Sequence, residues 1–110
     1  MNVIKLFSII SMGLFMSCSK SISETPACIN DKIADYSKSA TCKDATVKEY
    51  NFQSKTVYVF EPGTCGADMT WAVINADCKT IGHLGGIIGN TKINGAEFSS
   101  AVFVKIVWKK

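Results

Sequence analysis

The first seventeen residues constrain the fold of this 110-residue chain most, because they remove its longest apolar run from the folded part. Residues 1–5 include one lysine, and residues 6–16 are apolar apart from two serines and a glycine. A short basic start, an apolar stretch of about 7–15 residues and a small residue before the cut are typical of a secretory signal peptide. The run is shorter than the roughly 20 apolar residues of a membrane-spanning helix. We therefore expect residues 1–17 to be removed on export.

Cys18 follows Ser17 directly, and a polar run begins at Ser19. This arrangement resembles the lipobox of bacterial lipoproteins, although Phe15 stands where leucine is commoner. The sequence therefore predicts that Cys18 becomes the lipid-modified N-terminus. Two or three acyl chains at this position would hold the protein stably at a membrane. The alternative is an ordinary signal peptide with an incidental cysteine. The lack of an aspartate after Cys18 favours the outer membrane, and the lack of an acidic cluster there favours its periplasmic side.

The remaining chain divides into a short polar tether, residues 18–24, and one small domain, residues 25–110. An even number of cysteines in a small exported domain predicts disulfides, each adding about 2–4 kcal/mol of stability. The four cysteines of the domain are Cys28, Cys42, Cys65 and Cys78. No Cys-x-x-Cys motif occurs, so redox pairs, zinc ribbons and haem attachment lack their signature. We expect no metal and no cofactor.

Three pairings of the four cysteines are open. A helix that runs from Cys28 to Ser39 is about 16 Å long, and three further residues do not bring Cys42 back to within about 7 Å of Cys28. This geometry favours bridges from Cys28 and Cys42 to the later pair, Cys65 and Cys78, whereas a helix that ends near Tyr36 would restore a Cys28–Cys42 bridge.

One amphipathic helix is predicted over Pro26 to Ser39. Its apolar residues Ile29, Ile33 and Tyr36 recur at helical spacing. Thr25 is the expected N-cap, with proline at the first helical position.

Several later segments have the composition and alternation of strands. Residues 47–52 and 56–60 form a predicted hairpin whose second strand is the more buried. Residues 69–76 and 101–109 are two further strands, whereas residues 80–100 contain five glycines and give no regular pattern. The predicted fold class is therefore α+β, with one N-terminal amphipathic helix packed on an antiparallel sheet of about four disulfide-stapled strands.

The charged residues exclude a nucleic-acid partner. The chain has twelve basic residues, all of them lysines, and nine acidic ones. They are scattered along the sequence, and a mature chain without Lys5 would carry only a small positive charge. This distribution is that of a solvated mixed-charge surface rather than a basic nucleic-acid footprint.

A glycine-rich stretch after the third strand is the candidate binding loop. A phosphate cradle needs a preceding strand, a following helix and a Lys-Ser/Thr pair, and Lys92 is misplaced for that role. We expect a tight structural loop that packs over the core, which would act as a binding element if it were exposed. The candidate residues are Leu84, Gly85, Gly86, Gly89 and Asn90.

No catalytic signature appears in the chain, and an enzyme is not expected. His83 is the only histidine and has no patterned partner. An active site would need His83, Asp68 and Asp77 to converge in one cleft. The two tryptophans, Trp71 and Trp108, are expected in the core or at its rim.

Five segments recur together in one known family: residues 26–29, 47–52, 55–58, 65–68 and 78–89. In these segments the chain resembles a family of small, uncharacterised lipoproteins from Bacteroidetes, classed as a domain of unknown function. The resemblance implies an envelope location and no known activity. Relatives often carry two further cysteines, at positions corresponding to the neighbourhoods of Gly82 and Asn94, which implies that one bridge is missing here. Cys42 is less familiar in the family.

The combined expectation is a lipid-anchored envelope module with a binding or structural role. Its partners would be the membrane, through the anchor, and an envelope protein. A small secreted inhibitor of a protease or lysozyme is the alternative, with an exposed Leu84–Asn90 loop as its wedge. An enzyme with an unrecognised site is the third hypothesis.

Overall fold

The computed structural model describes residues 24–110, so the predicted signal peptide, the predicted lipidation site Cys18 and residues 18–23 of the tether lie outside the described residues. The described chain begins with α1 (Ala27–Ser39), where Ile29 and Ile33 are buried as the helical spacing predicts. The N-cap is Pro26 and no side chain caps the helix, so the predicted cap at Thr25 is wrong by one residue. Packing of the apolar stripe, rather than capping, therefore holds this helix in place.

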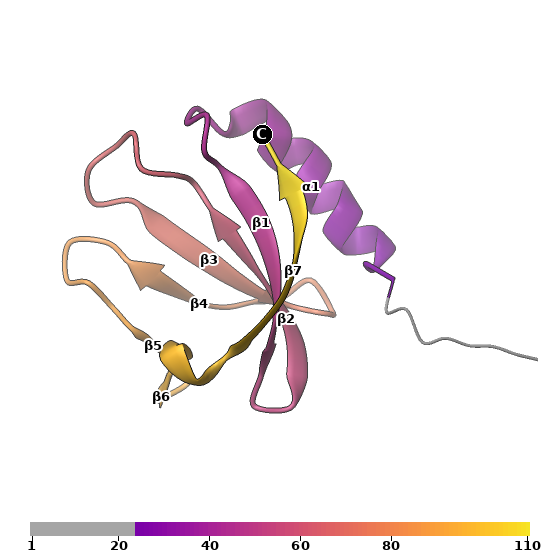
Figure 1. The fold of residues 1–110 in the computed structure, drawn as a ribbon, viewed down its shortest axis with the longest axis vertical. Coiled ribbons are helices and arrows are strands. Elements are labelled where there is room, and N and C mark those ends of the chain that lie inside the picture. Colours follow the sequence, from indigo (N-terminus) through magenta and orange to yellow (C-terminus); the bar gives the residue numbers. More distant parts are fainter. Residues whose placement is uncertain (1–23) are drawn as a thin grey trace, which may run out of the picture.

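Five antiparallel strands form the main sheet, in the order β4-β3-β2-β1-β7 (Figure 1). Their bounds are β1 (Thr46–Phe52), β2 (Lys55–Glu61), β3 (Thr70–Asn75), β4 (Thr80–Gly85) and β7 (Val102–Lys109). The predicted fold class is confirmed, with β4 as an additional strand from the glycine-rich part of the chain. The predicted hairpin turns at Gln53 and Ser54, which both have positive φ angles, as in the two-residue turns that suit twisted strands.

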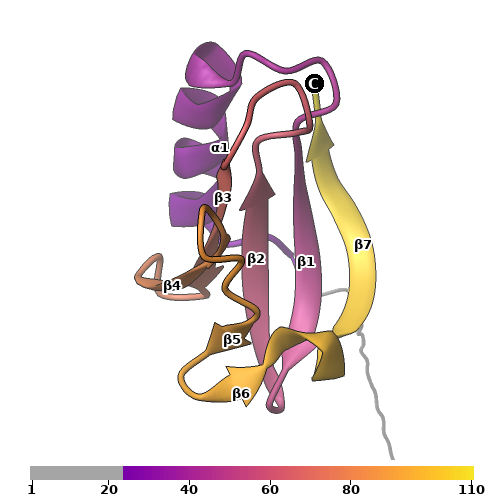
Figure 2. The same ribbon diagram turned by 90° about the vertical axis from the view of Figure 1, so that its left-hand side faces the viewer.

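The segment of sequence between β4 and β7 forms a second, small sheet. It consists of β5 (Lys92–Ile93) and β6 (Ala96–Glu97), and the short 3₁₀ helix η1 (Phe98–Ser100) follows it. Figure 2 shows this segment at the lower end of the main sheet.

Each face of the main sheet has its own apolar cluster. On one face α1 places Ile29 and Ile33 against Tyr58 and Phe60 of β2. On the other face the segment from β5 to η1 covers the lower part of the sheet, because Ile93 packs there with the remaining apolar side chains of that cluster. These residues are Phe52, Val57, Val59, Val73 and Leu84. Successive side chains of β2 point to opposite faces of the sheet and pack into the two clusters in turn. β2 is therefore the most buried strand.

Two disulfides connect elements that are distant in sequence, and their pairing agrees with the favoured scheme. Cys28 of α1 is bonded to Cys78 in the β3–β4 turn. Cys42, which precedes β1, is bonded to Cys65 in the β2–β3 loop. The first bridge ties the helix to the sheet, and the second ties two loops at the opposite end of β3.

Candidate binding surface at the β4–β5 loop

The β4–β5 loop is a short, hydrogen-bonded hairpin whose tip is exposed. The backbone N–H of Gly85 donates to the carbonyl of Asn90 at 2.8 Å, and the N–H of Asn90 donates back to Gly85 at 3.0 Å. Between them lies the Ile87–Ile88 tip (residues 86–89), where Ile87 is 85 % exposed and Ile88 is 88 % exposed. The prediction that this loop packs over the core is correct for Leu84, which is buried, but wrong for the tip.

The glycines of the loop explain why its isoleucines face solvent. Gly85, Gly86 and Gly89 have φ angles of 80°, 76° and 64°, a region that side chains disfavour. A Cβ atom on Gly85 would also approach the carbonyl oxygen of Met69 to 3.0 Å. The chain reverses within four residues, and the two central side chains are left at the outside of the turn.

Asn90 fixes the base of the loop with its side-chain amide. Its Nδ2 donates to the carbonyl of His83 at 2.6 Å and to that of Lys92 at 2.8 Å. Its Oδ1 accepts the N–H of Lys92 at 3.3 Å. A single side chain therefore joins the end of β4 to the start of β5, and this role accounts for the asparagine that closes the glycine-rich stretch.

The β2–β3 loop supports the tip from the side. Gly86 donates its N–H to the carbonyl of Met69 at 3.1 Å. That loop is itself held by the Cys42–Cys65 bridge and by Asp44, whose carboxylate accepts the hydroxyl of Thr64 at 2.6 Å and its N–H at 3.1 Å. The Thr64 hydroxyl and N–H lower the pKa of Asp44. The tip therefore projects from a cross-linked base rather than from a loose loop.

A cavity of about 470 Å³ lies between the two loops. It brings Asp68 and His83 to one place, beside Ile87 and Ile88. Asp77 lies in the turn beyond the other end of β3, about 20 Å away at 3.3 Å per residue of strand. The three residues that an active site would need therefore do not converge.

The two tryptophans have different environments. Trp108 packs edge-on against Tyr36 at a centroid distance of 5.9 Å, on the helix side of the sheet. Trp71 of β3 is 39 % exposed. Trp71 was expected in the core or at its rim and not as a candidate site residue. Ile87 and Ile88 were likewise not among the candidate residues, although the Leu84–Asn90 loop was a candidate wedge. The available signal was a pair of large apolar residues between glycines that favour a tight turn.

Residues 24–110 contain no group of three or more His, Cys, Asp or Glu side chains that could hold a metal ion. Over the same residues, no helix combines the length and apolarity needed to cross a bilayer.

The chain belongs to a family defined by a domain of unknown function, DUF6970, whose model matches residues 33–110. The match begins inside α1 and includes every strand, so it covers the sheet, the Cys42–Cys65 bridge and the β4–β5 loop. Cys28 precedes it. The searches of curated proteins and of solved structures gave no match.

Proposed function

We propose that this protein is a binding module of the bacterial cell envelope and that the Ile87–Ile88 tip is its protein-contacting element. The observation that carries the proposal is the exposure of both isoleucines on a loop held by backbone bonds, Asn90 and a disulfide-bonded neighbour. Two adjacent, almost fully exposed isoleucines are a candidate contact surface, and a rigid loop loses little conformational entropy on binding. The partner is a protein with an apolar pocket, because such a pocket would remove both side chains from water.

The proposal includes a lipid anchor at Cys18 in the outer membrane, with the domain facing the periplasm. The sequence pattern around Ser17 and Cys18 supports the anchor. The arrangement of the fold fits it, because the described chain begins next to α1 at the right of Figure 1, whereas the loop between β4 and β5 lies at the left. The mass of the protein extracted from native membranes tests this part. We expect a diacylglyceryl-modified chain that begins at Cys18, and an unmodified Cys18 thiol on the mature protein contradicts the anchor.

An inhibitor of an envelope protease or lysozyme is the second candidate, and the exposed, rigid tip specifically favours it. An inhibitory loop must enter the cleft of an enzyme without changing its conformation. A loop whose two ends are joined by backbone hydrogen bonds is rigid enough to do so. The residues between Leu84 and Asn90 would then form the wedge.

Site-specific photo-crosslinking in intact cells tests the contact. A photo-reactive amino acid at Ile87 is expected to give a discrete adduct with one envelope protein. The same group at Val102, which is 65 % exposed on β7, is the matched control and is expected to give none. Failure to crosslink at Ile87, or equal adducts from both positions, contradicts the proposed contact.

The identity of the captured protein separates the two candidates. If it is a hydrolase, the purified pair is expected to show inhibition that an I87S/I88S variant weakens by about tenfold or more. Because both side chains are exposed, this variant should retain the melting temperature of the wild type. A captured partner without hydrolase activity supports the binding module instead.

A further inference from the structure

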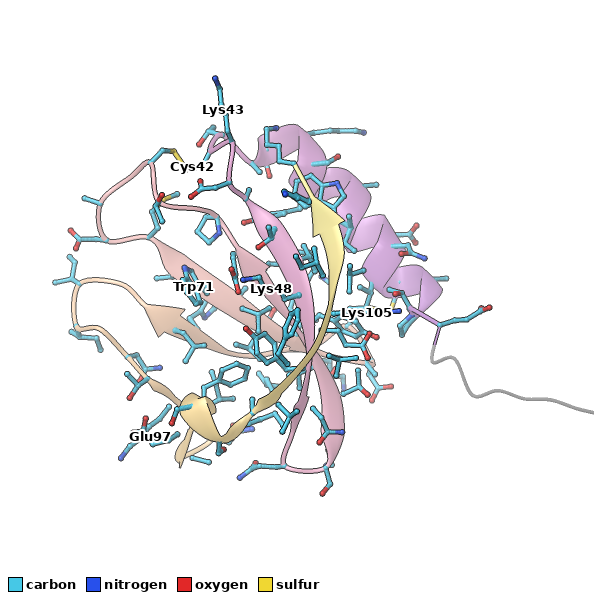
Figure 3. The ribbon with its side chains drawn as sticks, viewed as in Figure 1. Cys42, Lys43, Lys48, Trp71, Glu97 and Lys105 are labelled. Carbon is cyan, nitrogen blue, oxygen red and sulfur yellow. A yellow bond between two sulfur atoms is a disulfide. The ribbon has the colours of Figure 1, made fainter. Side chains whose placement is uncertain are left out.

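The sheet face opposite α1 is covered only in its lower part. Ile93 and Phe98 cover the apolar residues there, and Val73 of β3 is fully buried. Two residues further toward the β2–β3 loop, on the same face of β3, Trp71 remains exposed over more than a third of its surface. Figure 3 shows Trp71 and Lys48 projecting over this upper half of the sheet.

Strand register places a polar group directly beside Trp71. Phe60 pairs with Ala72, so the next residues in the same register, Glu61 and Trp71, lie opposite each other on the face away from α1. On its other flank, Glu61 pairs with Thr46 of β1. The indole and the carboxylate therefore occupy neighbouring strands of one face.

The carboxylate of Glu61 is oriented by two groups that both contact the same oxygen. Thr46 donates its hydroxyl to Oε1 at 3.1 Å, and the Lys48 ammonium lies 3.1 Å from Oε1. The Glu61 side chain is 11 % exposed, whereas that of Lys48 is 30 % exposed. The carboxylate also has a second oxygen, Oε2, and the Lys48 ammonium has two N–H groups beyond the one that faces Oε1. The pair thus offers an acceptor and donors side by side, with no net charge.

A cavity of about 290 Å³ adjoins Trp71 on the side of β4 and η1. Trp71, Leu84 and Phe98 supply its apolar surface. Its rim is polar, with Thr91 donating a hydroxyl bond to Glu97 Oε2 at 3.2 Å. An apolar surface with a few convergent polar groups is the usual composition of a small-molecule site.

We infer that this face binds a neutral saccharide, with one sugar ring against the indole of Trp71 and its hydroxyls on Glu61 and Lys48. A sugar ring has an apolar C–H face, and each of its hydroxyls both donates and accepts, which matches an indole next to a neutral acceptor–donor pair. An apolar peptide would cover the pair without satisfying it, at a desolvation cost. A free ion is disfavoured because the charges of Lys48 and Glu61 cancel. The site is separate from the Ile87–Ile88 tip and does not depend on the proposed function.

The experiment uses the full mature chain and an array of neutral oligosaccharides that includes tetra-N-acetylchitotetraose and maltotetraose. The strongest array member is then titrated by calorimetry and by NMR. The indole N–H signal of Trp71 is expected to shift with saturation. Trp108, the second tryptophan of the chain, lies on the opposite face, and its indole N–H signal should stay unchanged.

Variants assign the binding to this face. W71A is expected to lower the affinity by about tenfold or more, as is usual for a central aromatic contact. K48Q, which replaces the ammonium with a neutral amide on a side chain one atom shorter, should lower it several-fold. V102S alters a more exposed apolar residue on the distant strand β7 and should bind as the wild type does. Circular dichroism of each variant shows whether the fold is retained.

Three results would overturn the inference. They are the absence of saturable binding to any neutral oligosaccharide on the array, unchanged affinity of a folded W71A variant, and a shift of the Trp108 indole without one of Trp71. Binding of a peptide partner at Trp71 without any saccharide binding would likewise replace the inferred ligand.

Discussion

At the scale of single residues, the three tyrosines of the chain are buried or partly buried, and this burial affects their ionisation. Burial raises the pKa of Tyr36, Tyr50 and Tyr58, and nearby carboxylates add to the effect: Glu61 for the first two and Glu49 for Tyr58. The Tyr36 hydroxyl is buried with no hydrogen-bond partner in residues 24–110, so a tyrosinate there would have no donor. Burial therefore favours the neutral form at all three sites.

The raised pKa values predict a loss of stability at alkaline pH. In the unfolded chain a tyrosine ionises at its ordinary pKa of about 10, earlier than in the fold. The stabilisation is therefore complete below pH 10 and is lost as the pH rises through the folded pKa values. Absorbance at 295 nm should show tyrosinate only as circular dichroism reports unfolding. Tyrosines that ionise at their ordinary pKa in a chain with native circular dichroism would refute this prediction.

At the scale of elements, the two disulfides restrain loops of different length. The Cys28–Cys78 bridge spans 50 residues of sequence and the Cys42–Cys65 bridge spans 23. Because each bridge restricts the unfolded chain, we expect the free energy of unfolding to fall by about 4 kcal/mol in C28S/C78S and by about 3.5 kcal/mol in C42S/C65S. Urea denaturation of the paired variants measures both values. A larger loss for C42S/C65S would show that its shorter loop does more than restrict the unfolded chain.

The elements that could be predicted from sequence are those whose pattern is local. The spacing of Ile29 and Ile33 indicates α1, and the dense β-branched and aromatic run of β2 indicates a buried strand. β4 could not be recognised, because Gly82 interrupts its alternation of apolar and polar side chains. A glycine stands there because of a contact with a residue distant in sequence. A Cβ atom on Gly82 would lie 2.7 Å from Cδ1 of Ile93, a residue of β5 that covers the sheet. Such a long-range contact leaves no local periodicity.

The candidate site was predictable only in part, for a related reason. Glycines mark the β4–β5 loop, but they do not indicate which way its apolar side chains point. The direction depends on the positive φ angles of Gly86 and Gly89 and on the bond from Gly86 to Met69. The Trp71–Glu61 neighbourhood depends on the register between β2 and β3, which only the folded sheet establishes.

At the scale of the whole molecule, the sheet has an exposed apolar edge. β7 pairs with β1 on one side only, and its exposed side chains include Val102, Phe103, Val104 and Ile106. Long apolar edge strands pair readily with other chains, and natural proteins protect them with lysines and bulges. β7 has both protections, since Lys105 lies near its middle and two register shifts interrupt its pairing with β1.

This arrangement predicts that Lys105 keeps the molecule from associating through β7. Replacing it in a K105V variant joins the apolar residues on either side into an uninterrupted run of exposed edge. We expect this variant to form larger species in size-exclusion chromatography with light scattering. K79V makes the same chemical change in the β3–β4 turn, away from the β7 edge, and is expected to elute as the wild type does. If K105V and K79V elute alike, the bulges alone protect the edge, because they bend β7 away from the straight geometry that a pairing strand needs.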